Sequence, residues 1–213
     1  MASKRELFDF QRLRDEFRAA KTPDSEILLE EYATAFMDIA GFFDLLGTVF
    51  GFVATEIREK VKILRAHRAE SPEHYASLQS MAAHEIAAGI TRVKPTKSGP
   101  VSGCRTVLGL HRTLEFVTRF LYRVKDMPDE GHTSTAAGEE YKATLARYDS
   151  WLAQKVALLA IKTLPTRKVF IERNVKQSKD EVEAIADSAL GLMAEVVDIT
   201  QKLLEENNLL DLL

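Results

Sequence analysis

Apolar residues recur at helical spacing along most of this chain, and this periodicity limits the fold more than any other feature. Leu28, Tyr32, Phe36, Ile39 and Phe43, for example, return every three or four residues, which places them on one face of a helix. Glycine and proline are sparse, at 10 and 6 of 213 residues. No alternating apolar run or Asn-Gly hairpin signal indicates a strand. The pattern therefore predicts an all-α protein.

Breaks in the periodicity divide the chain into about eight helices, which we assign to a single domain spanning residues 1–213. We expect helices at about 4–20, 25–46, 48–67, 71–93, 104–125, 137–148, 150–165 and 178–207, and the interval 166–173 is compatible with one short helix. Pro72 is expected to open the fourth helix, because proline is suited to the first helical position. The segment 94–103 is rich in proline and glycine and predicts a loop.

Charge and cysteine content argue against several classes of protein. Lys and Arg total 29 against 32 Asp and Glu, a net charge of -3, so nucleic acid is not an expected partner. Cys104 is the single cysteine and cannot form an internal disulfide, so we expect a reducing, cytoplasmic compartment. Residues 37–54 are apolar, but Asp38, Asp44 and three glycines interrupt them. We therefore expect protein core there and not a membrane span.

No arrangement of residues in the sequence indicates catalysis or a metal site. His84-Glu85 lacks the second histidine that a zinc-binding helix of this type needs. The five histidines show no ligand spacing, and no glycine-rich turn follows a strand, as a phosphate-binding loop requires. We therefore expect no enzyme activity, no cofactor and no metal.

Two charged residues continue an apolar stripe in the predicted third helix. Val49, Phe52, Glu56, Lys60 and Ile63 follow one another in steps of three or four. This arrangement suits the polar rim of an apolar pocket. An exposed i,i+4 ion pair, which contributes only a few tenths of a kcal/mol, gives the same spacing and is the commoner case.

A further cation stands at the start of the predicted helix 104–125. Arg105 lies on a stripe with Leu108, Arg112 and Phe116. A guanidinium beside aromatic residues suits the polar mouth of an apolar pocket, because it can bind a phosphate or carboxylate through two donors. A merely solvated arginine is the poorer explanation, since the helix dipole disfavours a cation at that end.

The segment Tyr148-Asp149-Ser150-Trp151 precedes another predicted helix. Asp149 or Ser150 is suited to be its N-cap, and capping is the simplest role for both. Trp151, the only tryptophan, is suited either to anchor the core or to contact a membrane surface. Lys155 and the lysines and arginines that follow it supply a local positive field for such a surface.

Four blocks of sequence resemble the glycolipid transfer protein superfamily. They are LLGTVFGFVATEIREK at 45–60, SGCRTVLGLHRTLEFVTRFL at 102–121, TLPTRKVF at 163–170 and the ending NNLLDLL. They follow the family's order over nearly the whole chain and are most similar to the members that carry ceramide-1-phosphate. The resemblance implies a two-layer all-α fold enclosing an apolar lipid pocket. It also implies a monomer that docks transiently on a membrane and carries one sphingolipid through the cytosol.

The resemblance also assigns residues to the lipid headgroup. The acid that holds the ceramide amide and hydroxyl falls at Glu56, where the family usually has aspartate, and the headgroup lysine falls at Lys60. The phosphate-binding cation falls at Arg105. A second arginine is expected where this chain has Gly109, and the family's amide-binding histidine falls at Asp149. Glu56 and Asp149 against Lys60 and Arg105 make this expected site formally neutral.

These departures leave alternatives open. A phosphate monoester carries about -1.5 to -2 charges, so we expect weaker binding than the family pattern gives, with ceramide-1-phosphate still the first ligand to test. A neutral or zwitterionic sphingolipid, or a lipid sensor without transfer activity, are the rivals. At residue level, Asp149 caps its helix in one alternative, and His111 or Tyr148 takes its place at the headgroup.

The remaining expected contacts are apolar or face the membrane. The resemblance implies membrane contact at Trp151, and we expect Lys155 to join that contact through its positive charge. Apolar residues at helical spacing that we expect to line the pocket are Phe52, Phe116, Phe120 and Leu159.

Overall fold

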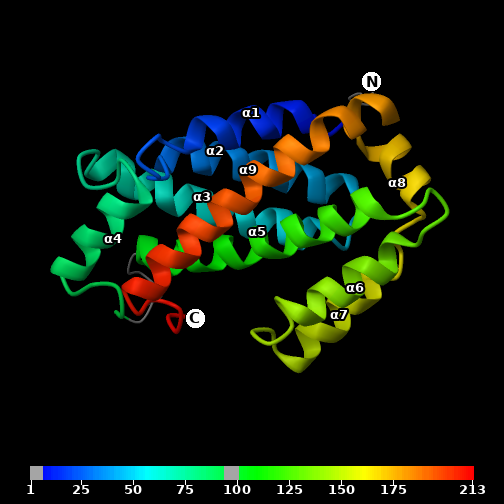
Figure 1. Cartoon of the computed structure of the whole chain (residues 1–213). Helices are drawn as coiled ribbons and strands as arrows, with labels where there is room; N and C mark the ends of the chain where they lie inside the picture. The colour runs from blue at the N-terminus through cyan, green and yellow to red at the C-terminus, as the bar shows by residue number, and fades with distance from the viewer. Residues whose placement is uncertain (1–6, 94–100) are drawn as a thin grey trace, which may run out of the picture.

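The computed structural model describes residues 7–93 and 101–213, and nine α-helices span that part of the chain (Figure 1). They are α1 (Phe10–Ala20), α2 (Leu29–Leu45), α3 (Gly51–Glu70), α4 (Leu78–Ala87), α5 (Gly103–Asp126), α6 (Thr133–Ala143), α7 (Trp151–Ile161), α8 (Arg167–Asn174) and α9 (Lys179–Glu206). Strand-like pairing among these residues is limited to isolated bridges. The prediction of an all-α protein is therefore confirmed.

Five of the helices close a ring around the core. Helix α1 packs on α2 and α9, α2 packs on α3, and α5 joins α3 to α9. Figure 1 shows α5 and α9 in front of α2 and α3, which gives two layers with α1 along one edge. Helix α4 covers the beginning of α5, while α6 packs on α5 and carries α7 away from the ring. Helix α5 thus touches both layers and both outlying groups of helices.

A buried acid fixes the beginning of α5. Glu85 is fully buried, and its carboxylate accepts hydrogen bonds from the backbone N–H groups of Gly103 at 2.6 Å and Cys104 at 3.0 Å. Tyr75 donates a third bond at 3.0 Å. The first N–H groups of a helix have no partner within it, and the helix dipole favours an anion there. The His84-Glu85 pair therefore serves the fold through Glu85.

The predicted beginnings of two helices are wrong, and one long-range contact explains both. Helix α2 begins at Leu29 and not near residue 25, and α4 begins at Leu78 and not at residue 71. The Leu29 N–H donates to the Ala76 carbonyl at 3.0 Å, and the Leu78 N–H donates to the Ile27 carbonyl at 2.8 Å. The two segments thus pair with each other in extended form, and each helix starts only after this pairing ends.

Other boundaries differ by a few residues. Helix α3 lies at Gly51–Glu70 and not at 48–67, and its N-cap, Phe50, makes no side-chain hydrogen bond to it. Helix α6 lies at Thr133–Ala143 and not at 137–148. Helix α1 starts at Phe10 with Asp9 as N-cap; residues 1–6 and 94–100, which include most of the expected loop, lie outside the described residues. No described helix is both long and apolar enough to cross a membrane.

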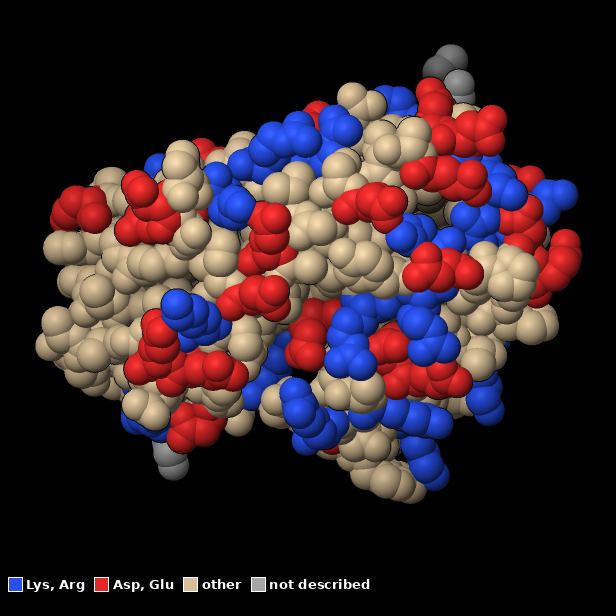
Figure 2. Space-filling model, in the orientation of Figure 1, with Lys and Arg blue, Asp and Glu red and all other residues tan. Residues whose placement is uncertain are grey.

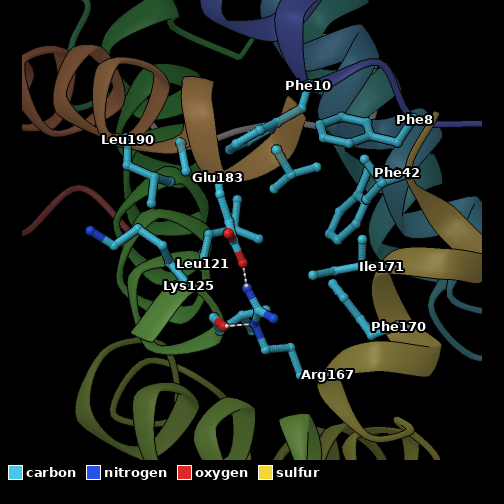
Figure 3. A pocket seen from close by; sticks show the side chains of 14 residues that line it. Phe8, Phe10, Phe42, Leu121, Lys125, Arg167, Phe170, Ile171, Glu183 and Leu190 are labelled. Carbon is cyan, nitrogen blue, oxygen red and sulfur yellow. Dashed lines mark hydrogen bonds and ion pairs between the residues drawn. The ribbon is translucent and has the colours of Figure 1, made fainter. Parts of the chain in front are cut away.

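An apolar cavity of about 50 Å³ lies where α1, α2, α8 and α9 meet α5 (Figure 3). Phe8, Phe10, Phe42 and Phe170 project into it, and Arg167 lies at its edge with a guanidinium nitrogen 3.5 Å from Glu183. Aromatic rings that pack against one another leave little open space in it. The cavity lies at the end of the ring opposite α4.

Candidate functional site

A groove with a volume of about 670 Å³ opens between α3 and α5 on one side and α6 and α7 on the other. Its lining is mainly apolar and includes several polar side chains. The polar residues of the lining are Glu56, Lys60, Arg112, Thr113, Tyr141, Tyr148, Asp149 and Ser150. A concave apolar site with a few convergent polar groups is the usual form of a small-molecule site.

Glu56 and Lys60 lie one turn apart on α3, and both line the groove. The Lys60 ammonium donates to the Glu56 carboxylate. Their side chains differ in exposure, at 20% for Lys60 and 70% for Glu56. The i,i+4 ion pair is therefore present, and both of its residues line a groove. An ion pair and a place beside an apolar pocket, which the sequence offered as alternatives, thus occur together.

Gly109 on α5 makes room for the Lys60 side chain. A Cβ atom built on Gly109 would lie 2.5 Å from Cε of Lys60, far inside van der Waals contact. The aliphatic part of Lys60 thus crosses the surface of α5 where a larger residue would stand. A side chain at position 109 would have to displace the end of Lys60, which is flexible.

Asp149 faces the groove and does not cap α7. Ser150 is the N-cap, and its hydroxyl accepts a bond from the Ala153 N–H at 3.3 Å. Asp149 instead accepts a bond from the Tyr141 hydroxyl at 2.6 Å. This contact and burial raise the pKa of Tyr141, with burial the larger cause. The alternative in which Asp149 serves only as a cap is wrong.

Arg112 is a groove residue that the sequence did not single out for the headgroup. It lies on α5, one turn after Gly109, and is 7% exposed. Its Cζ is 3.3 Å from the centroid of the Tyr148 ring, and Nη2 donates to the Leu210 carbonyl at 2.8 Å. Its place between Leu108 and Phe116 on an apolar stripe was the available signal.

Arg105 and His111 lie outside the groove lining. Arg105 is half-buried in the first turn of α5, and its Nε is buried without a hydrogen-bond partner among the described residues. His111 bonds through Nε2 to Gln201 of α9 at 2.6 Å, so it faces away from the groove. Burial lowers the pKa of His111. Tyr148, the other alternative to Asp149, does line the groove.

Of the four apolar residues expected to line the pocket, two line the groove and two do not. Phe52 and Phe116 line the groove. Phe120 is buried behind Phe116 with ring centroids 6.0 Å apart, so it belongs to the core. Leu159 is 64% exposed on α7 and contributes to the outer surface.

One side of α7 presents apolar side chains to solvent. Trp151, Leu152, Val156 and Leu159 are all exposed, Trp151 to 68%, and their spacing places them on one side of the helix. Lys155 belongs to the same side, with Nζ 3.8 Å from the centroid of the Trp151 ring. Figure 2 shows uncharged surface bordered by basic side chains at the free end of α6 and α7. Exposed apolar patches of this kind mark interaction surfaces.

The sequence pattern of the family described as Glycolipid transfer protein (GLTP) matches residues 27–176. The chain belongs to the glycolipid transfer protein family.

Relatives in this family are similar over almost their entire length. The chain is 37% identical to the ceramide-1-phosphate transfer protein of Mus musculus and 39% identical to that of Rattus norvegicus, over 92% of each chain in both comparisons. The crystal structure of human ceramide-1-phosphate transfer protein in complex with 2:0 ceramide-1-phosphate superposes with a TM-score of 0.89 at 32% identity. That superposition covers 98% of this chain and 100% of the human one. The expected two-layer fold of the family is confirmed.

Proposed function

We propose that this chain binds ceramide-1-phosphate in the groove and transfers it between membranes without making or breaking a covalent bond. The similarity to a structure that contains this lipid carries the proposal. The groove supports it independently, because cationic and hydrogen-bonding side chains line it together with many apolar ones. An amphipathic lipid with an anionic headgroup needs both.

In the headgroup contacts that we propose, Lys60 binds the phosphate and Glu56 accepts bonds from the ceramide amide and hydroxyl. Both already lie on the groove rim. Asp149 is the third polar group in reach of the headgroup and adds negative charge beside it. Arg105 stays a proposed phosphate contact, on the same side of α5 one turn before Gly109.

A continuous series of aromatic contacts supports a path for the lipid chains. Phe116 lines the groove, and the ring of Phe120 lies between it and Phe170, whose centroid is 5.7 Å from that of Phe120. The ring centroid of Phe170 lies 5.8 Å from that of Phe42, and both residues line the apolar cavity where α1, α2, α8 and α9 meet α5. We propose that the hydrocarbon chains enter from the groove along this path. If the hydrocarbon chains insert between these rings, the rings contact the lipid and stay out of water. The chains also leave water, which makes their burial favourable.

We further propose that the apolar side of α7 contacts the membrane while the lipid is exchanged, and that the whole chain acts as one monomeric domain. Trp151 and Lys155 combine an amphipathic ring with a cation, which suits the boundary between lipid headgroups and acyl chains. The groove opens beside this helix, because Leu152, Ala153 and Val156 line it as well. A lipid could thus pass from the membrane into the groove over a short distance.

A vesicle-to-vesicle transfer assay tests the proposed function. Ceramide-1-phosphate, galactosylceramide and sphingomyelin are compared as cargo for the wild-type chain and for Lys60→Ala and Arg105→Leu. We expect faster transfer of ceramide-1-phosphate than of the other two lipids, with at least a tenfold loss in Lys60→Ala because one charge-assisted contact is removed. Equal transfer of all three lipids, or none, would contradict the proposed ligand.

The same assay tests the membrane contact through Trp151→Ala. This variant should slow transfer of every lipid alike, while short-chain ceramide-1-phosphate in solution binds as before. Ile86→Ala on α4 is the matched control, since Ile86 is also an exposed apolar residue but lies outside α7. Unchanged transfer by Trp151→Ala would remove α7 from the proposed membrane contact.

A further inference from the structure

Arg112 is a nearly buried cation whose contacts carry no formal negative charge. The contacts of its guanidinium are the Leu210 carbonyl, at 2.8 Å, and the face of the Tyr148 ring. Among the described residues, no carboxylate oxygen comes within 4.0 Å of it, whereas Lys60, Arg119 and Arg123 each have such a partner. A buried charge without a counter-ion is costly to keep in a folded protein.

The surroundings of Arg112 do not remove this cost. Glu115, one turn further along α5, lies closer to Arg119, at 3.8 Å. Arg147 stands 4.8 Å from the same Tyr148 ring and adds positive charge. Burial lowers the pKa of the Arg112 guanidinium; Tyr148 and Glu115 oppose this effect and Arg147 reinforces it. The Tyr148 ring therefore lies between two guanidinium groups, and among the described residues no carboxylate forms an ion pair with that of Arg112.

The position of Arg112 suits a ligand in the groove. It lines the same groove as Lys60 and lies one helical turn beyond Gly109. Lys60 already pairs with Glu56, so its charge is partly neutralised before any ligand binds. A larger residue at position 109 would need the space that the Lys60 side chain occupies. Gly109 has no side chain to offer a ligand, and Arg112 is the arginine of α5 that lines the groove.

We infer that Arg112 is a further phosphate-binding cation, beside Lys60 in the groove lining, and that it sets the preference for a phosphorylated headgroup. The inference rests on the proposed function and adds a residue to it. The Tyr148 ring and the Leu210 carbonyl hold the guanidinium in place, and its remaining donors meet the phosphate oxygens as the lipid enters. Binding of the phosphate supplies the counter-ion that the free protein lacks.

The test compares equilibrium binding of short-chain ceramide-1-phosphate with that of short-chain ceramide, which differs only in lacking the phosphate. For Arg112→Gln we expect affinity for ceramide-1-phosphate to fall roughly 10- to 100-fold, because the variant loses a charge-assisted hydrogen bond to the phosphate. Affinity for ceramide should change less than twofold. Arg112→Lys should be intermediate, since it keeps the charge but not the planar donors. Arg147→Gln is the matched control and should keep the preference within twofold.

The outcomes separate the inference from the proposed function. If affinity for both lipids falls together in Arg112→Gln, the residue only holds Tyr148 and the Leu210 segment, and the inference is overturned. If neither affinity changes, it is overturned as well. If wild type binds ceramide as tightly as ceramide-1-phosphate, the proposed ligand itself is wrong, whatever Arg112 does.

Discussion

Charged side chains of both signs line the groove. Glu56 and Asp149 are its two acids, and Lys60 and Arg112 are its two cations. The stripe alone favoured a plain ion pair for Glu56 and Lys60, and the family resemblance predicted their place at the lipid site, where both do line the groove. The contact of Arg112 with the Tyr148 ring could not be predicted, because that ring comes from a segment 36 residues further along the chain.

Removing the charge of Asp149 should strengthen binding of a phosphorylated lipid. We expect Asp149→Asn to raise affinity for short-chain ceramide-1-phosphate roughly 3- to 10-fold, because one repulsive charge leaves the groove. Asparagine keeps an oxygen that can accept the Tyr141 hydroxyl. Asp149→His, which restores the family residue, should act in the same direction.

Isothermal titration calorimetry measures both variants, with Asp187→Asn as control, because Asp187 is an exposed acid on α9 that contacts Lys125. Weaker or unchanged binding by both Asp149 variants would show that this carboxylate does not oppose the phosphate.

Elements with strong local signals could be predicted closely, and elements set by long-range pairing could not. Helices α5 and α9 begin within a residue of the expected positions, because Ser102 and Ser178 cap them and long apolar stripes follow. The beginnings of α2 and α4 depend on backbone bonds between the segments before them. Such bonds join residues about 50 positions apart and leave no periodic signal in either segment.

The contact between α1 and α2 contains an acid pair that should make stability depend on pH. Glu16 of α1 is half-buried with Oε2 unpartnered among the described residues, and Asp38 of α2 binds Arg12 through bonds of 2.5 and 2.8 Å. Burial first, and then the neighbouring Asp38 charge, raise the pKa of Glu16 from 4.5 to about 7. The folded protein therefore holds a proton between these pH values that the unfolded chain releases.

Stability should consequently fall as pH rises from about 4.5 to about 7, since the folded state binds the extra proton. We expect Glu16→Gln to raise the free energy of unfolding at pH 8 by about 1–2 kcal/mol, after allowance for solvent screening, and to change it little at pH 5. Urea unfolding at the two pH values measures this. Glu59→Gln, at an exposed position on α3, is the control and should show no such difference between the two pH values. An equal effect of Glu16→Gln at both pH values would contradict a raised pKa of Glu16 in the folded protein.

At the scale of the whole molecule, α5 connects the parts that the proposed function needs. Arg105, Gly109 and Arg112 lie in its first turns. Phe116 and Phe120 lie in its middle, on the side of the apolar cavity that Phe42 and Phe170 line. The groove itself could not be located from sequence, because α6 and α7 form its other wall only through the way they fold back from α5. The family resemblance predicted a two-layer fold with an apolar lipid pocket but did not say which helices form its walls; the similarity to the human structure agrees with the fold.

A crystal structure with short-chain ceramide-1-phosphate tests the central claim most directly, because it locates the phosphate. The account predicts phosphate oxygens within hydrogen-bond distance of Lys60 and Arg112, with Arg105 on the same side of the phosphate. It also predicts the amide facing Glu56 and the hydrocarbon chain directed past Phe116. A phosphate bound outside the groove, or within it but apart from both cations, would contradict the account.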